Sequence, residues 1–170
     1  MMHVTWCTLI LCVSLLLQPI CAQTADQWTN IKIHRTIDLR SHIEEQLITI
    51  DGTYDGTQPS NQYTVIIPAP KSMHLSLVES YITDNNNKHN KLDVAEINDT
   101  SIFQSVDMNG AELYSVTLPR TYNKGDTITF NVHTVYTRTI QAYPETIEHG
   151  DNQLVLYTDS VIFYSPYRPS

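Results

Sequence analysis

The clearest alternation of apolar and polar residues lies between residues 127 and 137, directly after a turn-like segment at residues 123–126. Every second residue is apolar as far as Val132, and the segment is rich in β-branched and aromatic side chains, which suit a pleated, half-buried surface. This period of two predicts a β-strand with one buried and one solvated face. The apolar positions then shift by one residue to Val135, which either a bulge or a strand covered on both faces would produce.

Shorter segments of the same character recur along the chain. They cover residues 31–39, 47–50, 63–67, 74–78, 92–97, 114–118, 154–157 and 161–164. Turns are expected at Asp51-Gly52, at Asp55-Gly56 and in the polar segment 84–90, and the prolines at positions 68, 70, 119 and 144 should end strands. No window carries the apolar stripe of a long helix. The pattern therefore predicts a mainly β fold, an antiparallel β-sandwich of short strands.

The alternation also selects the residues that should form the core. The predicted core is Ile31, Ile33, Val65, Leu75, Leu77, Val116, Leu118, Ile128, Phe130 and Val132. Arg35 interrupts the apolar face of its segment, so we expect it at a sheet edge or paired with a carboxylate.

Residues 1–22 have the features of a secretory signal peptide. An apolar run at residues 8–17 is followed by Pro19, and small residues favour cleavage after Ala22. An uncleaved anchor is the alternative, but the run is shorter than the roughly 20 residues of a membrane-spanning helix. We therefore expect a leader at 1–22 and one β-sandwich domain at 23–170.

Composition narrows the classes of function. The 170 residues include 10 Lys and Arg against 18 Asp and Glu, and the resulting net charge of −8 disfavours binding to nucleic acid or anionic lipid. A hydrophobic content of 41% suits a globular domain. All three cysteines, Cys7, Cys12 and Cys21, lie in the leader, so we expect no disulfide and no thiol chemistry in the mature chain.

No segment carries a recognisable motif for catalysis, for a cofactor or for a metal. The histidines after the leader are His34, His42, His74, His89, His133 and His149. They lack the spacing of helical zinc sites, so exposed or hydrogen-bonded histidines are expected, with convergence of two or three on a metal as the alternative. Asp38, Ser41 and His42 do not suit a hydrolase triad, because neighbours on one strand point to opposite faces.

Two other groups of residues allow alternatives. The acidic residues Asp84, Asp93, Glu96 and Asp99 lack the spacing of an EF-hand loop, so we expect a solvated face, with a weak calcium site as the alternative. Tyrosines gather near the C-terminal end, at Tyr136, Tyr143, Tyr157, Tyr164 and Tyr167. They suit either a contact surface for a partner or the edges and caps of the sandwich.

Asn98-Asp99-Thr100 is the single N-glycosylation sequon of the chain. Because it follows a predicted leader, we expect Asn98 to lie on an exposed loop or strand edge and to be a candidate for glycosylation.

Several segments together resemble the ribophorin I family, subunit 1 of the dolichyl-diphosphooligosaccharide–protein glycosyltransferase complex. The segments are Arg35-Thr36-Ile37-Asp38-Leu39-Arg40-Ser41-His42-Ile43, Val116-Thr117-Leu118-Pro119, Lys124-Gly125-Asp126, Thr134-Val135-Tyr136-Thr137, Tyr143-Pro144 and Phe163-Tyr164-Ser165-Pro166-Tyr167. Their order and spacing match the family over most of residues 35–167, except in the middle, at residues 52–105.

The resemblance implies a non-catalytic subunit of the oligosaccharyltransferase complex, which N-glycosylates nascent proteins in the endoplasmic reticulum. The chain would be the N-terminal lumenal domain, without a cofactor. Its partners would be other subunits, the catalytic one included, with nascent polypeptide as a further contact. Family members continue into a membrane span, so a chain that stops at Ser170 is expected to be truncated and to meet the membrane only through a missing downstream segment. The alternative is a secreted β-sandwich that binds protein or glycan. A secreted hydrolase is disfavoured by the absent motifs.

Overall fold

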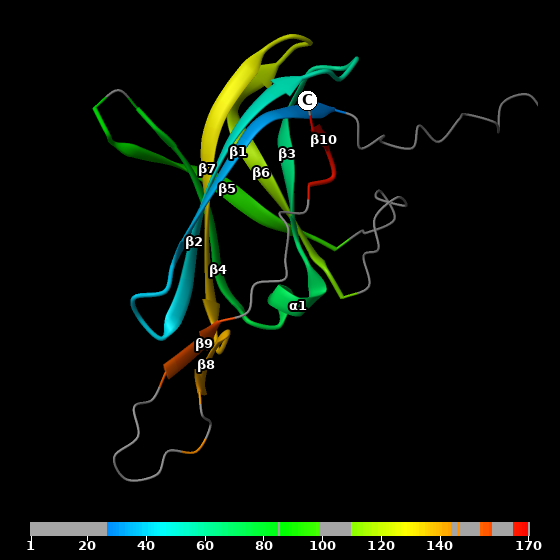
Figure 1. Cartoon of the computed structure of the whole chain (residues 1–170). Coiled ribbons are helices and arrows are strands. Elements are labelled where there is room, and N and C mark those ends of the chain that lie inside the picture. Colours follow the sequence, from blue (N-terminus) through cyan, green and yellow to red (C-terminus); the bar gives the residue numbers. More distant parts are fainter. Residues whose placement is uncertain are drawn as a thin grey trace, which may run out of the picture.

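The computed structural model describes residues 27–84, 86–98, 110–143, 146, 154–157 and 165–169, and strands dominate it (Figure 1). The strands are β1 (Trp28–Asp38), β2 (Ile43–Tyr54), β3 (Ser60–Ile67), β4 (Leu75–Thr83), β5 (His89–Ile97), β6 (Glu112–Tyr122), β7 (Thr127–Thr137), β8 (Ile140–Tyr143), β9 (Leu154–Tyr157) and β10 (Arg168–Pro169), and the single helix among these residues is α1 (Ala69–Ser72). The mainly β prediction is confirmed. Within the same residues, no helix is both long and apolar enough to cross a lipid bilayer.

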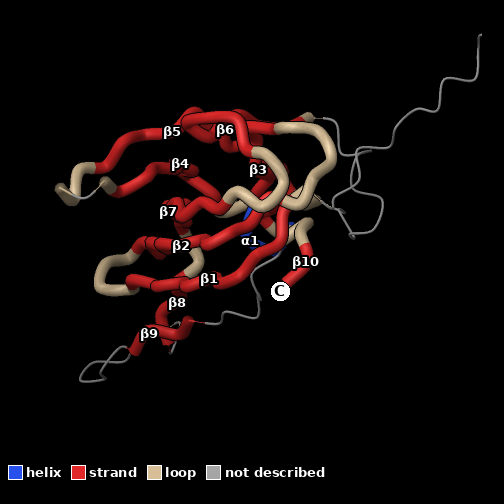
Figure 2. Tube along the Cα trace, turned by 90° about the horizontal axis from the view of Figure 1, so that it is seen from above, coloured by secondary structure: helices blue, strands red, loops and turns tan. Residues whose placement is uncertain are grey.

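Eight strands form one sheet in the order β10-β1-β2-β7-β4-β5-β6-β3. The neighbours pair in antiparallel fashion, except that the short β10 runs parallel to β1. Strand β7, which has the clearest sequence pattern, lies inside the sheet between β2 and β4. Figure 2 shows β3, β5 and β6 turned over toward β1, β2 and β7. The two layers of the expected sandwich are therefore the two halves of one curled sheet.

Aromatic side chains fill the space between the two halves. The indole of Trp28 on β1 lies 4.9 Å from the ring of Tyr54 and 5.5 Å from that of Tyr122. Tyr63 on β3 packs edge-on against Phe130 of β7, with ring centroids 4.9 Å apart. Because β1 and β3 lie near opposite ends of the strand order, this cluster holds the curl together. The Trp28 indole also donates a hydrogen bond of 2.9 Å to the carbonyl of Gln62.

Two residues of the predicted core are exposed, and local irregularities explain both. The exposed fraction is 53% for Ile31 and 40% for Leu77. In β1 the pairing with β2 shifts between Asn30 and Lys32, so the bulged Ile31 leaves the inward-facing alternation. In β4 a similar shift between Leu75 and Leu77 turns Leu77 outward. The other predicted core residues are buried or half-buried.

Two further expectations need correction, and one open alternative is decided. Strand β6 continues past Pro119 to Tyr122, although the sequence predicts that this proline ends the strand. Asp51-Gly52, predicted as a turn, lies within β2, and the indole of Trp28 packs over Gly52. The shift of the apolar pattern at Val135 reflects no bulge in β7, because β7 pairs with β2 in one unbroken register. Instead, Thr134 occupies the inward position with no exposed surface, while Val135 is half-buried on the opposite face.

Candidate functional site

A groove lies on the face of the sheet opposite the aromatic core. Its walls are the β1–β2 and β4–β5 hairpins, and His133 of β7 lies between them. Glu45 and Leu47 reach the groove because they alternate along β2 with the buried Gln46 and Ile48. The volume is about 510 Å³, and the lining residues are Thr36, Asp38, Glu45, Leu47, Glu79, Ser80, Tyr81, His89, Lys91 and His133. This volume lies within the range of small-molecule sites.

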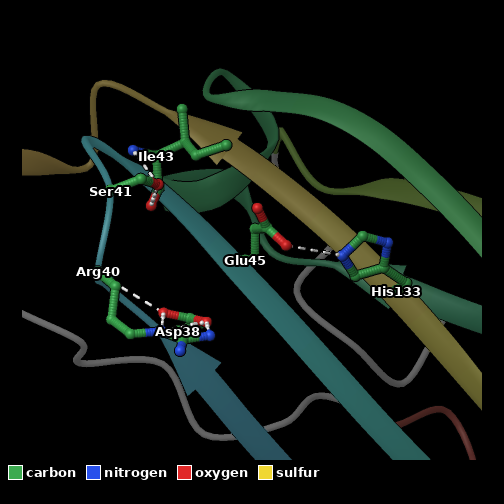
Figure 3. Close-up of polar contacts among 6 residues, drawn as sticks. All are labelled: Asp38, Arg40, Ser41, Ile43, Glu45 and His133. Carbon is green, nitrogen blue, oxygen red and sulfur yellow. Dashed lines mark hydrogen bonds and ion pairs between the residues drawn. The ribbon is translucent and has the colours of Figure 1, made fainter.

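Each of the three carboxylates in the groove faces a basic group. Asp38 binds Arg40, whose Nε lies 3.0 Å from both carboxylate oxygens, and Glu45 lies 3.6 Å from Nε2 of His133 (Figure 3). On the other wall, Nζ of Lys91 lies 2.5 Å from Oε1 of Glu79. The charges on both walls are therefore largely compensated locally.

The basic partners also fix the ionisation of two of these carboxylates. The hydrogen bond from Arg40 lowers the pKa of Asp38 to about 2. The hydrogen bond from Lys91 likewise lowers the pKa of Glu79. Both groups are therefore ionised at neutral pH and can only accept hydrogen bonds.

An aromatic pair stands on the β4–β5 wall. The rings of Tyr81 and His89 are stacked with centroids 4.2 Å apart and an angle of 10° between their planes. Tyr81 is half-buried and His89 is exposed. The pair therefore presents a flat ring surface beside the polar groups of the groove.

A second polar cluster is buried on the core side of the sheet. Helix α1 carries Lys71 inward, and its Nζ lies 2.8 and 2.6 Å from the two carboxylate oxygens of Glu44 on β2. Gln46 and Tyr157 donate to the same carboxylate, and Lys71 lies 5.2 Å from the ring centroids of Tyr136 and Tyr157. The cluster therefore joins α1, β2, β7 and the separate β8–β9 hairpin.

Burial and hydrogen bonding act in opposite directions on Glu44. Burial raises the pKa of the carboxyl, but the hydrogen bonds from Lys71, Gln46 and Tyr157 outweigh it, so the pKa is lowered overall. Glu44 is therefore ionised and paired, which fits a structural link between elements.

The predicted histidines and carboxylates are distributed over several surfaces. His89 and His133 line the groove, His34 and His42 are exposed elsewhere, His74 is half-buried, and His149 lies outside the described residues. In the described part of the chain, no three His, Cys, Asp or Glu residues are placed to hold a metal ion. Asp84 accepts hydrogen bonds of 2.9 Å from the backbone of Asn86 and Lys88, and so closes its own loop.

The three neighbouring residues Asp38, Ser41 and His42 have separate surroundings. Asp38 binds Arg40, and the Ser41 hydroxyl lies 3.3 Å from both the backbone nitrogen and the carbonyl oxygen of Ile43 (Figure 3). The exposed His42 lies in the turn between β1 and β2. The side chains of Asp38 and Ser41 therefore form hydrogen bonds within the turn between β1 and β2.

Asn98 is exposed directly after β5, whereas Asp99 and Thr100 lie outside the described residues. Residues 1–26, with the predicted cleavage position at Ala22, also lie outside them.

Tyr136 and Tyr167 are buried, with exposed fractions of 3% and 8%, so they belong to the core and not to an outer contact surface. Tyr157 is half-buried beside Glu44. The side chain of Tyr143 and all of Tyr164 lie outside the described part.

Sequence reasoning missed both polar clusters. The groove joins residues between positions 36 and 133, and only the alternation along each strand could have shown that Glu45, Glu79 and His133 share a face. Lys71 follows Pro68-Ala69-Pro70 and looks like part of a solvated loop in the sequence. No local signal marks it as buried.

Comparison with known proteins gives a consistent match. The family model described as Ribophorin I matches residues 28–170. Subunit 1A of the dolichyl-diphosphooligosaccharide–protein glycosyltransferase of Arabidopsis thaliana is 27% identical over 140 residues, which cover 80% of this chain and 22% of the relative. Subunit 1B from Oryza sativa subsp. japonica is 28% identical over 139 residues, 81% of this chain and 29% of the relative. The chain thus spans less than a third of the length of these curated relatives.

Proposed function

The chain belongs to the ribophorin I family, and on that premise we propose that it forms the N-terminal lumenal domain of a non-catalytic subunit of the oligosaccharyltransferase complex. The observation that carries the proposal is the family match over residues 28–170, which takes in every strand of the eight-stranded sheet. The named relatives are subunits of this glycosyltransferase. The proposed partners are the other subunits of the complex, the catalytic one included, with nascent polypeptide as a further contact.

The chemistry of the groove supports a role in recognition. A general acid needs a carboxyl pKa near the working pH, which burial or a neighbouring negative charge would raise. The pKa values of Asp38 and Glu79 are instead lowered, because Arg40 and Lys91 bind them. Carboxylates in this state suit the binding and orientation of a ligand.

We place the domain in the lumen of the endoplasmic reticulum, delivered there by cleavage of the leader after Ala22, with residues 23–170 as the mature domain. N-terminal sequencing of the protein purified from eukaryotic cells tests this. The expected first residue is Gln23. A mature protein that begins at Met1 or Met2 would contradict the proposed processing.

Co-purification tests membership of the complex. The full-length gene product is tagged, membranes are solubilised in a mild detergent that preserves the complex, and the catalytic subunit is sought in the eluate. An unrelated tagged protein of the same membranes is the control. We expect the catalytic subunit only with the family protein. Its absence under conditions that recover the other subunits intact would reject the assignment and favour a secreted binding module.

A transfer assay tests the non-catalytic role separately. The purified chain is given a dolichol-linked oligosaccharide and an acceptor peptide, beside the intact complex as the positive control. We expect glycopeptide only from the complex. Transfer by the purified chain alone would contradict a non-catalytic role, whatever its partners.

A further inference from the structure

We propose that the groove between the β1–β2 and β4–β5 hairpins binds a short, uncharged oligosaccharide. The groove crosses five adjacent strands, from β1 to β5. At the usual spacing between strands this is roughly 19 Å, which suits a chain of sugar rings better than a single ring. The proposal concerns the domain itself and does not depend on the assembly proposed above.

The charges in the groove favour an uncharged ligand. Asp38 and Glu79 are already bound by Arg40 and Lys91, so a charged ligand would have to compete with an existing ion pair. A sugar hydroxyl need not compete at Glu79, because a carboxylate has about four acceptor positions and Lys91 occupies only part of them. Asp38 offers no such opening, because Arg40 donates four hydrogen bonds to its two oxygens. Glu45 offers the most accessible acceptor, because its side chain is 47% exposed.

The aromatic wall favours a sugar over other uncharged polar ligands. A pyranose ring has an apolar face of C–H groups and an edge of hydroxyl groups. The stacked rings of Tyr81 and His89 offer a flat surface for the apolar face, and His89 is the outer, exposed member of the pair. The carboxylates of Glu45 and Glu79 in the same groove offer acceptors for the hydroxyl groups. The groove thus combines both kinds of contact.

The backbone in the groove disfavours an extended peptide. Peptides that bind to sheets commonly add a strand to an exposed edge, where free backbone groups form the hydrogen bonds. In the groove, His133 of β7 pairs with Leu47 on one side and with Glu79 on the other. Strands β2 and β4 are likewise paired on both sides. The floor therefore offers side chains only, which suits a ligand recognised through its hydroxyl groups.

Binding is tested with the full chain secreted from eukaryotic cells, in an Asn98→Gln background so that a glycan on the protein itself cannot interfere. The probes are an oligomannose series and a chito-oligosaccharide series. An acidic heparin oligosaccharide and a lysine-rich peptide serve as comparators. Isothermal titration calorimetry gives the affinity, and NMR shift changes locate the site.

Two substitutions in the groove and one matched control decide the result. We expect at least one neutral series to bind, and Glu45→Gln and His89→Ala each to weaken that binding by about tenfold. Asp93→Asn, an exposed carboxylate on β5 outside the groove, should leave it unchanged. Equal melting temperatures confirm that all three variants are folded.

Three outcomes would overturn the proposal. The first is no binding of either neutral series up to about 10 mM, a concentration at which even a very weak site is occupied. The second is binding that neither groove substitution weakens. The third is tighter binding of the lysine-rich peptide or of heparin in the groove, which would make the ligand a charged polymer.

Discussion

Lys71 and Glu44 form an ion pair inside the folded domain, with 2.6 Å between Nζ and Oε2 and side-chain exposures of 7% and 0%. Two charges removed from water in this way require each other, because either one alone would remain buried without compensation. The pair also brings α1 and, through Tyr157, the β8–β9 hairpin against the main sheet. Its loss should therefore affect both stability and the position of the hairpin.

Removal of Glu44 should strongly destabilise the domain. Glu44→Ala leaves the Lys71 ammonium buried without a counter-charge, and we expect a loss of about 3–5 kcal/mol in the free energy of unfolding. The neighbouring Glu45→Ala is the control, because its contact with His133 is partly exposed and should cost at most about 1 kcal/mol. Urea unfolding measures both. Equal midpoints for the two variants would show that the buried pair contributes no more than the exposed one.

The Glu44 carboxylate should also make stability depend on pH. Its pKa in the folded state lies below the ordinary value of 4.5. The unfolded chain therefore takes up a proton first as the pH falls, so the contribution is present above the unfolded pKa of 4.5 and is lost progressively as the pH falls through the lower pKa of the folded state. We expect a Glu44→Gln variant to lose less stability than the wild type between pH 5 and pH 3. Parallel pH curves for the two proteins would contradict this.

Truncation of Phe130 tests the position of the core. Phe130 has no exposed surface and packs edge-on against Tyr63, so Phe130→Ala should cost about 3–5 kcal/mol, from lost burial and from the cavity left behind. Ile31→Ala, at the outward bulge, should change the free energy of unfolding by no more than about 0.5 kcal/mol. Thermal and urea unfolding compare the two. A larger effect at Ile31 would show that the two faces of β1 are wrongly assigned.

Gly125 and Gly52 should respond in opposite directions when they are replaced by alanine. Gly125, in the turn between β6 and β7, has a φ of +91°, and no heavy atom beyond its two chain neighbours lies within 4 Å of the position that a Cβ would take. Gly125→Ala should therefore cost about 1–2 kcal/mol from backbone strain alone. Gly52 lies in a strand, and a Cβ there would lie 3.6 Å from the Trp28 indole, an ordinary contact. Gly52→Ala should be neutral, or stabilising by about 0.5–1 kcal/mol. If Gly52→Ala lowers the unfolding midpoint as much as Gly125→Ala does, this account is wrong.

Glycosylation of Asn98 remains a prediction from the sequon and is consistent with the exposure of the residue after β5. The protein secreted from eukaryotic cells should migrate faster after treatment with an N-glycosidase. The Asn98→Gln variant should migrate at that faster position without treatment. Identical mobility of the treated and untreated wild type would show that the sequon is not used.

The sequence predicted those parts of the fold that depend on local pattern. The alternation up to Val132 is enough to place β7, and Pro68 marks the end of β3, because a proline cannot donate to the ladder. The same reasoning failed at Ile31. A bulge at this residue turns its side chain outward, and nothing in the local sequence indicates the bulge. It also failed at Asp51-Gly52. This pair has the composition of a turn, but it lies within β2, where the indole of Trp28 packs over Gly52.

The sites could not be predicted because they are assembled from distant segments. Glu45 and His133 meet only because β2 pairs with β7, and Glu79 joins them because β4 lies on the other side. Pairing between strands that are far apart in sequence depends on the packing of the whole sheet. Lys71 is buried because a single helical turn happens to face Glu44, and no periodicity can appear in four residues.

The contact between the first strand and the last described segment determines when folding can be completed during synthesis. The Asn30 side chain bonds to Ser165, 135 residues later, beside the short pairing of β1 with β10. At roughly 5–20 residues per second, a ribosome needs roughly 7–27 seconds to make the chain between them. Trp28 is made before that interval begins and Tyr63 follows 33 residues after Asn30, but Tyr167, which packs on Tyr63, is made only after the interval ends. The nascent sheet would keep the outer edge of β1 uncovered until then, so we expect chaperones to bind this domain before its synthesis is complete.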